Sequence, residues 1–394
     1  MNALTATNFS LEAGALHLQK LLQGNPSNLP PTLRKKLTES QAPDTLTALF
    51  PGESLHEEWK YTPLSILRTP WTLGQTLLSA ETPYALPFQK PQLHAMDNSP
   101  AIESLPTPIT PWEKLILSGS TSYAAATLPQ DGLYALSISH PTPGAAAPTF
   151  YTIYVPAGVQ AELVLHSAIH PEAFLLLQVH FALEAGARLT LYHSAPEGPQ
   201  GSLLFLLSGA VQKEAGFTFY SLPGRYRWVR TESRLLLKGP GAEGLLYGAH
   251  TTQENEVCDT AIRVSHLAPH THSNQLFRSI AFKGGRRIFL GRIYVAREGQ
   301  KTNAYQSHKA ILWENGAEVY SRPQLEIFAD DVRCTHGVTT GFLQGDMLFY
   351  LRSRGLPEAT ARTLIAEGFL MEALETLPTE ALRAHARTNL GLAV

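Results

Sequence analysis

The chain has 394 residues, a formal net charge of −2 and 16% charged residues. This balance gives no electrostatic case for binding nucleic acid or an acidic membrane surface. The charged fraction lies below the about 25% typical of soluble domains, so we expect part of the surface to be buried against a partner. The length allows one large domain with appendages or two or three smaller ones.

The sequence shows no pattern of a targeting signal, a membrane-spanning stretch or a disulfide framework. Residues 1–20 lack the basic start and apolar core of a secretory signal. No stretch has 18 uninterrupted apolar residues, the length that spans a membrane. The two cysteines, Cys258 and Cys334, are far apart and unlike a disulfide framework. We therefore expect a cytoplasmic protein without a membrane segment.

The N-terminal part divides into two regions. Residues 1–70 are predicted to be helical, because leucines and alanines between residues 11 and 22 recur at helical spacing. Pro30 and Pro31 then open a second helical segment over 32–39. Residues 71–148 are rich in Pro, Ser and Thr, which favours loops with short strands.

The central part, residues 149–341, has the texture of a β-protein. Short apolar runs recur between Gly, Asn or charged turns, with almost no helical periodicity. A sandwich or a barrel would fit this pattern. The runs are short and closely spaced, however, and most lack hairpin signals such as Asn-Gly. This favours a β-helix, a solenoid in which each coil stacks on the last.

The C-terminal part, residues 342–394, is predicted to be helical. Asp346 begins a short helix that stops at Gly355, and Pro357 begins a longer one that ends before Pro378. The longer helix has two apolar stripes, Ala361, Leu364, Ile365 and Gly368 on one side and Leu370, Leu374 and Leu377 on the other. One stripe is expected to pack on the body. The other is either core or a docking face for a partner.

A candidate metal-binding pair lies in the segment A-D-D-V-R-C-T-H-G-V-T-T-G at residues 329–341. If this segment is a strand, Cys334 and His336 share one face, because residues i and i+2 do. A thiolate beside an imidazole suits iron, zinc or copper(I). However, a zinc or iron–sulfur site usually has about four ligands, more than these two residues provide. These residues alone also fit the alternative that Cys334 is a buried apolar residue and His336 a turn residue.

Longer motifs surround this pair. They are E-E-W-K-Y-T at residues 57–62, Q-S-H-K-A-I-L-W-E-N-G-A-E-V-Y-S-R-P-Q-L-E-I-F-A-D-D-V-R-C-T-H-G at 306–337, L-F-Y-L-R-S-R-G-L at 348–356 and A-E-G-F at 366–369. With these motifs the sequence resembles the SufB/SufD family of iron–sulfur cluster assembly proteins, and within it the SufD branch. The N-terminal 150 residues match only in the first motif.

This resemblance implies a mainly β fold, a right-handed parallel β-helix flanked by N-terminal and C-terminal helical regions. It implies a non-catalytic subunit of the SUF complex that pairs with SufB. A transient iron–sulfur cluster would form at their interface, with a cysteine from SufB and His336 from this chain as ligands and Cys334 as a further candidate. No cofactor is expected to stay tightly bound to the isolated chain. A homodimer of the isolated chain is compatible with this expectation.

The resemblance also implies that the C-terminal helices dock an ABC ATPase of the SufC type. The candidate docking residues are Leu348, Phe349, Tyr350, Arg352, Arg354, Gly355, Leu364 and Phe369. The nucleotide chemistry would belong to that partner, since this chain shows no Walker motif, nucleophile elbow or paired-carboxylate spacing.

A second candidate site is the run H-L-A-P-H-T-H, with His266, His270 and His272. A His-x-His pair on an extended segment is a common half of a metal site, and it supports the alternative of a free-standing metal-dependent enzyme or a sugar-binding solenoid. Pro269 interrupts the strand, which favours polar turn histidines on a solenoid rim instead.

Overall fold

The computed structural model describes residues 11–22, 31–38, 59–64, 66, 69, 71–79, 89–94, 100–104, 111–120, 122–343 and 345–391. About 52% of the chain is strand, wound into a parallel solenoid of about 8 turns with a few helices near the termini. The predicted β-helix is thus confirmed. The predictions for residues 39–58 lie outside the described residues.

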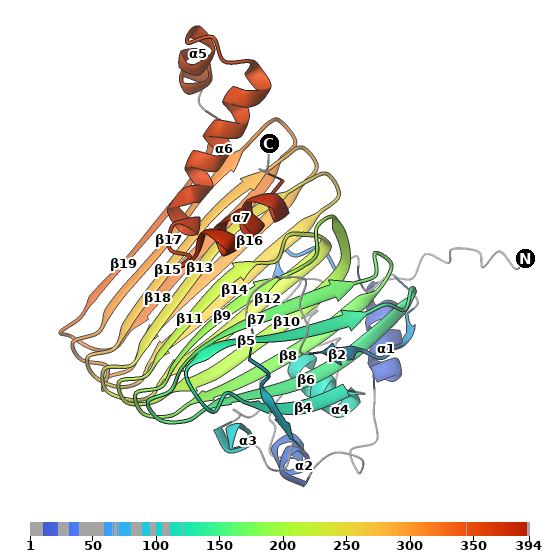
Figure 1. The fold of residues 1–394 in the computed structure, drawn as a ribbon, viewed down its shortest axis with the longest axis vertical. Helices are drawn as coiled ribbons and strands as arrows, with labels where there is room; N and C mark the ends of the chain where they lie inside the picture. The colour runs from blue at the N-terminus through green and yellow to red at the C-terminus, as the bar shows by residue number, and fades with distance from the viewer. Residues whose placement is uncertain are drawn as a thin grey trace, which may run out of the picture.

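Alternate strands of the solenoid enter two sheets (Figure 1). Sheet A contains β1 (Thr72–Leu73), β3 (Gln92–His94), β4 (Ser122–Thr127), β6 (Ala145–Val155), β8 (Phe174–Leu183), β10 (Pro199–Val211), β12 (Arg225–Leu237), β14 (Val257–His266), β16 (Arg286–Val295) and β18 (Glu318–Ile327). Sheet B contains β2 (Leu77–Ser79), β5 (Gly132–His140), β7 (Gln160–Ile169), β9 (Arg188–Ser194), β11 (Gly216–Leu222), β13 (Glu243–Thr252), β15 (His272–Ala281), β17 (Asn303–Leu312) and β19 (Arg333–Phe342).

One coil of the solenoid takes about 29 residues. Cys258 and Arg287, for example, are 29 residues apart and occupy the same register on β14 and β16. From β4 to β19 every strand pairs in parallel with the strand two positions on. Turns between coils use the left-handed backbone region, as at Gly186 (φ 70°) and Gly284 (φ 75°), where glycine has no steric penalty.

The interior of the solenoid changes character along its length. Towards the N-terminal end it is mostly apolar, and Phe181 and Phe217 stack there with their ring centroids 4.0 Å apart. Towards the C-terminal end the buried interior also carries polar groups, among them His250, Arg287 and Gln306. Burying polar groups is favourable only where they find hydrogen bonds, so this end is held together by a polar network as well as by apolar packing.

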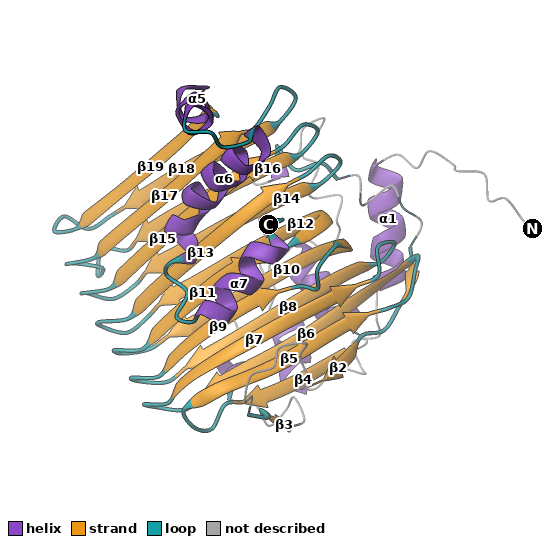
Figure 2. Ribbon diagram, turned by 45° about the horizontal axis from the view of Figure 1, so that its top comes forward, coloured by secondary structure: helices purple, strands orange, loops and turns teal. Residues whose placement is uncertain are grey.

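Seven helices are described: α1 (Leu11–Leu22), α2 (Pro31–Thr38), α3 (Ala101–Ser104), α4 (Pro111–Gly119), α5 (Gly345–Ser353), α6 (Glu358–Leu374) and α7 (Glu380–Asn389). The N-terminal helix α4 packs against β6 and β8 of sheet A, where Trp112 meets Phe174. Helices α6 and α7 lie on the outer face of sheet B (Figure 2). Helices therefore cover both sheets, which explains why all ten residues of β8 are buried.

Solenoid strands already occur within residues 71–148, the region for which loops and short strands were expected: β4 begins at Ser122 and β6 at Ala145. Pro148 lies inside β6, although proline cannot donate to a β-ladder. The pairing of β6 with β1 ends at Ala146, and its pairing with β4 begins only at Thr149. Pro148 thus occupies a gap on that side of the strand, where a missing N–H leaves no partner carbonyl unbonded.

A membrane-spanning helix is not found in the described part of the chain; each helix there is too short or too polar.

Candidate functional site

The C-terminal end of the solenoid is open. Strands β18 and β19 end their sheets, and within the described residues no strand covers their outer edges (Figure 1). An edge strand presents a row of unpaired N–H and C=O groups, which natural proteins protect with proline, lysine or short length. β18 carries Pro323, whereas the ten residues of β19 include neither proline nor lysine. β19 is therefore an unprotected edge that fits another strand.

The predicted Cys–His pair lies on this edge strand. Cys334 is half-buried against a small apolar cluster that includes Val295 and Ala304. Burial raises the pKa of its thiol, so the thiol is protonated near neutral pH. His336, two residues on, is exposed. Of the two side chains, the imidazole is thus the one that another molecule reaches first.

A column of glutamines leads from the interior towards His336. Gln275, Gln306 and His336 are in register on β15, β17 and β19. Both glutamines are fully buried, and neither amide finds a hydrogen-bond partner in the described residues. Buried amides without partners are rare, so two unusual polar groups occupy the register that ends at His336 on the edge strand.

The described residues do not complete a metal site around His336. Within them, no group of three or more His, Cys, Asp or Glu side chains is placed to hold a metal ion. Cys334 and His336 offer two ligands, whereas an iron–sulfur cluster usually takes four. The described residues near this edge thus provide fewer protein ligands than a cluster usually takes.

The histidines of the second candidate site lie in different environments. His266 is buried at the end of β14, with Nδ1 2.8 Å from the Thr271 hydroxyl and Nε2 2.9 Å from the Ser273 hydroxyl. Burial lowers its pKa to about 3, so the ring is neutral. His270 is exposed in a left-handed turn (φ 58°), and His272 begins β15. The rim position expected for these histidines fits His270 but not His266, whose two nitrogens are already occupied.

The predicted docking residues surround α5 and the start of α6. Phe349 is 74% exposed and Tyr350 56% exposed on α5, and Leu364 is 45% exposed on α6. Leu348 and Phe369 are half-buried, while Arg352, Arg354 and Gly355 are exposed. A predominantly apolar groove of about 750 Å³ lies between these helices and the strands β17 and β19. Its lining includes Phe342, Tyr350, Leu364 and Phe369.

The two apolar stripes of α6 have different environments. Leu370, Leu374 and Leu377 are buried against the outer face of sheet B. On the other stripe Ala361 and Ile365 are buried, whereas Leu364 and Gly368 are exposed and line the groove. The stripe facing the sheet is therefore intramolecular core, and the groove side is the part of α6 available to a partner.

The residues W-K-Y-T at 59–62, from the first motif, fasten the N-terminal segment to sheet A. Trp59 lies under the Arg230 guanidinium, 3.8 Å from it, and Tyr61 stacks on Tyr320 with ring centroids 4.7 Å apart. The hydroxyl of Thr62 donates to Asp259, which is also paired with Arg230. Arg230 and Asp259 are both fully buried, so this motif holds a buried ion pair in place.

Sequence reasoning missed the polar network around Arg287. Arg287 is fully buried; its Nε donates to the Ser279 hydroxyl at 2.9 Å and its Nη1 to the Cys258 carbonyl at 3.0 Å. Its Nη2 lies 3.3 Å from Nδ1 of His250. Burial and the nearby guanidinium hold the pKa of His250 well below its usual range, so His250 is neutral and accepts this bond.

Comparisons with known proteins match the chain to one family. A family described as SUF system FeS cluster assembly, SufBD core domain, matches residues 141–369. The iron–sulfur cluster assembly protein SufD of Escherichia coli is 39% identical over 138 residues, which is 35% of this chain and 33% of that protein. A SufBD family protein of Synechocystis is 36% identical over 132 residues, covering 34% of this chain and 29% of that protein.

A SufBD family protein of Mycobacterium leprae is 27% identical over 214 residues, covering 52% of this chain and 54% of that protein. The matched part of the chain therefore spans about a third of the length of the first two relatives and about half of the third.

Proposed function

The chain belongs to the SufBD family of SUF-system iron–sulfur cluster assembly proteins, and from this premise we propose that it is a SufD-like, non-catalytic subunit of a cytoplasmic assembly complex. In this proposal it pairs with a SufB-like paralogue, docks a SufC-like ATPase and contributes His336 to a nascent cluster. The observation that carries the proposal is the position of His336, exposed on an unprotected edge strand at the open end of the solenoid.

The open edges support pairing with a second β-helix. An extended strand added to an exposed sheet edge gains main-chain hydrogen bonds along its whole length. A paralogue with a similar end would extend sheets A and B beyond β18 and β19. The same surface would allow the isolated chain to form a homodimer. Sedimentation of the chain alone and with the paralogue distinguishes these states, and the heterodimer is expected to displace the homodimer.

The incomplete ligand set supports a shared cluster. The cluster is the cargo of the complex, held transiently between His336 and cysteine from the paralogue. His336 would act as a neutral imidazole ligand, and Cys334 as a second ligand or as a packing residue whose thiol is kept protonated by burial.

The groove beside α5 and α6 supports docking of the ATPase. Amphipathic elements bind in apolar grooves through a few anchoring side chains, and Tyr350 and Leu364 are exposed at this one. Leu364→Ser is expected to abolish ATPase capture while leaving the paralogue bound. Leu16→Ser is the matched control, because Leu16 is an equally exposed leucine (43%) on α1. Equal capture by both variants would place the ATPase elsewhere.

Movement would pass from the ATPase to the cluster through α6. This helix contacts strands β13 and β15 of sheet B, and its residue Glu372 pairs with Arg278 on β15. ATP-driven closure of paired ATPase subunits would shift α6 and the edge strands together, which would open the interface to iron and sulfide.

The direct test replaces His336. His336→Ala is expected to abolish cluster formation by the reconstituted complex, measured by visible absorbance and by iron and sulfide content, while gel filtration shows the complex still assembled. His270→Ala is the control, since it removes an exposed histidine from a turn of the same solenoid. Wild-type cluster yield in the His336 variant would overturn the assignment. The alternative of a self-sufficient metal site at His266, His270 and His272 has no support in the geometry described above.

A further inference from the structure

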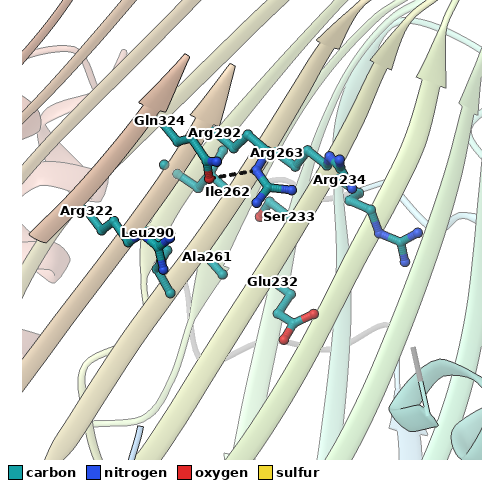
Figure 3. Close-up of a pocket in the computed structure, with 11 residues that line it drawn as sticks. Glu232, Ser233, Arg234, Ala261, Ile262, Arg263, Leu290, Arg292, Arg322 and Gln324 are labelled. Carbon is teal, nitrogen blue, oxygen red and sulfur yellow. Dashed lines mark hydrogen bonds between the residues drawn. The ribbon is translucent and has the colours of Figure 1, made fainter. Parts of the chain in front are cut away.

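A row of arginines crosses the outer face of sheet A. Arg234, Arg263 and Arg292 are in register on β12, β14 and β16. The row continues to Gln324 on β18, and Arg322 lies two residues before it on the same strand. Neighbouring strands of a sheet are about 4.8 Å apart. Three arginine side chains thus project from the same register of three neighbouring strands (Figure 3).

Small side chains make hollows on either side of this row. On β14, Ala261 lies two residues before Arg263 and Ser265 lies two residues after it. A cavity of about 80 Å³ lies over Ala261, lined by Arg234, Arg263, Arg292 and Arg322. A second cavity of about 210 Å³ lies over Ser265 and shares Arg234 and Arg263 with the first. Arg263 therefore stands between two adjoining hollows.

The positive charge of the row is only partly balanced. Arg234 pairs with Glu113 of α4, and Nε of Arg292 lies 3.5 Å from Glu326. Glu232, which also lines the smaller cavity, is paired with the buried guanidinium of Arg230 at 2.7 Å. Arg263 makes no ion pair or hydrogen bond to any described residue. Like charges opposite each other on a sheet are destabilising, and the described residues provide no counter-charge for Arg263 at the centre of the row.

We propose that this arginine row is an anion site that binds a phosphate-class polyanion through Arg263 and its neighbours. The arginine fork matches the oxygen geometry of phosphate and binds it bidentately. Several guanidinium groups around one hollow favour a multiply charged anion over a single carboxylate. The cavities are smaller than the ~300–1,000 Å³ typical of drug-sized ligands, which favours inorganic phosphate or pyrophosphate over a larger molecule. This site is independent of the cluster assembly role proposed above.

The test titrates the full-length protein with pyrophosphate by calorimetry, at constant ionic strength set with sodium chloride. Wild-type protein is expected to bind, and Arg263→Gln to weaken the affinity at least tenfold. Arg227→Gln is the matched control: it removes the same charge from an exposed arginine on β12 outside the row, and is expected to bind like wild type. Arg263→Lys is expected to lose part of the affinity, because it keeps the charge without the fork.

Thermal melting without ligand shows whether Arg263→Gln is folded, and we expect a melting temperature equal to or above that of wild type because repulsion along the row is relieved. Parallel titrations with phosphate and ADP distinguish the source of the group. Tighter binding of ADP than of pyrophosphate assigns the site to the phosphates of a nucleotide, and weaker binding assigns it to the free anion. Absence of binding by all three anions, or equal loss in Arg263→Gln and Arg227→Gln, would overturn the proposal.

Discussion

Lowering the pH is expected to destabilise the solenoid through its buried histidines. Burial lowers the pKa of His193 and of His266 from 6.5 to about 3. Both rings are neutral in the folded protein at pH 5 but are mostly protonated in the unfolded chain. Because the folded pKa is the lower one, the stabilising contribution is fully present above pH 6.5 and is lost as the pH falls towards 3.

The size of this effect at a given pH depends on how far that pH lies below the unfolded-state pKa of the imidazole. A pH of 5 lies about 1.5 units below the unfolded-state pKa. Protonation at this pH therefore stabilises the unfolded chain by about 2 kcal/mol for each histidine, at about 1.36 kcal/mol per unit. His193 and His266 together are therefore expected to reduce the free energy of unfolding by about 4 kcal/mol between pH 8 and pH 5. His250 and His308, whose pKa values burial and nearby arginines also lower, act in the same direction.

Urea denaturation at pH 8, 6.5 and 5, followed by tryptophan fluorescence, measures this loss. His193→Gln is expected to reduce the loss by about 2 kcal/mol, because it removes one titrating ring beside the Ser167 hydroxyl. The comparison at pH 8 isolates any structural effect of the substitution, since the imidazole is neutral there in both states. A midpoint that does not change between pH 8 and pH 5, or a His193→Gln variant with the same pH dependence as wild type, would refute the reasoning.

Two further pairs of substitutions test the packing of α6 and the buried ion pair of Arg230. Leu370→Ala, which truncates a fully buried leucine between α6 and sheet B, is expected to cost about 2–5 kcal/mol in urea denaturation and to expose the C-terminal helices to protease. Leu364→Ala on the groove side is the control, with an expected change of about 0.5 kcal/mol or less. Asp259→Asn leaves the buried Arg230 short of a counter-charge and is expected to cost about 3 kcal/mol. Glu243→Gln, which breaks a half-exposed pair, is expected to change stability by less than about 1 kcal/mol. Equal losses within either pair of variants would contradict the burial on which these values rest.

The solenoid itself could be predicted from the sequence because its strands are apolar, β-branched and separated by turn residues. The coils between Phe174 and Phe342 fit that pattern. The early coils did not, because β4 and β6 contain alanine runs of low β-propensity and β6 contains Pro148. What allows these strands to form is tertiary, namely the gap in pairing beside Pro148 and the cover that α4 provides.

The candidate site could be predicted only where its residues are close in sequence. Cys334 and His336 are two positions apart, so the strand geometry was sufficient to place them on β19. Arg234, Arg263 and Arg292 recur every 29 residues and meet only when the coil length is known. A search of the sequence for a repeat at the period of one coil would have found them. The pairing of Arg287 with His250 crosses from sheet A to sheet B, and no spacing in the sequence signals it.

The central claim, that this chain works as one subunit of a cluster assembly complex, is tested most directly by what it binds in the cell. A tagged chain purified anaerobically from cells of its own source, with its partners identified by mass spectrometry, gives the answer in one measurement. We expect a SufB-like paralogue with a larger set of cysteines and a SufC-like ABC ATPase in stoichiometric amounts. Recovery of the chain alone, carrying its own bound metal, would contradict the account.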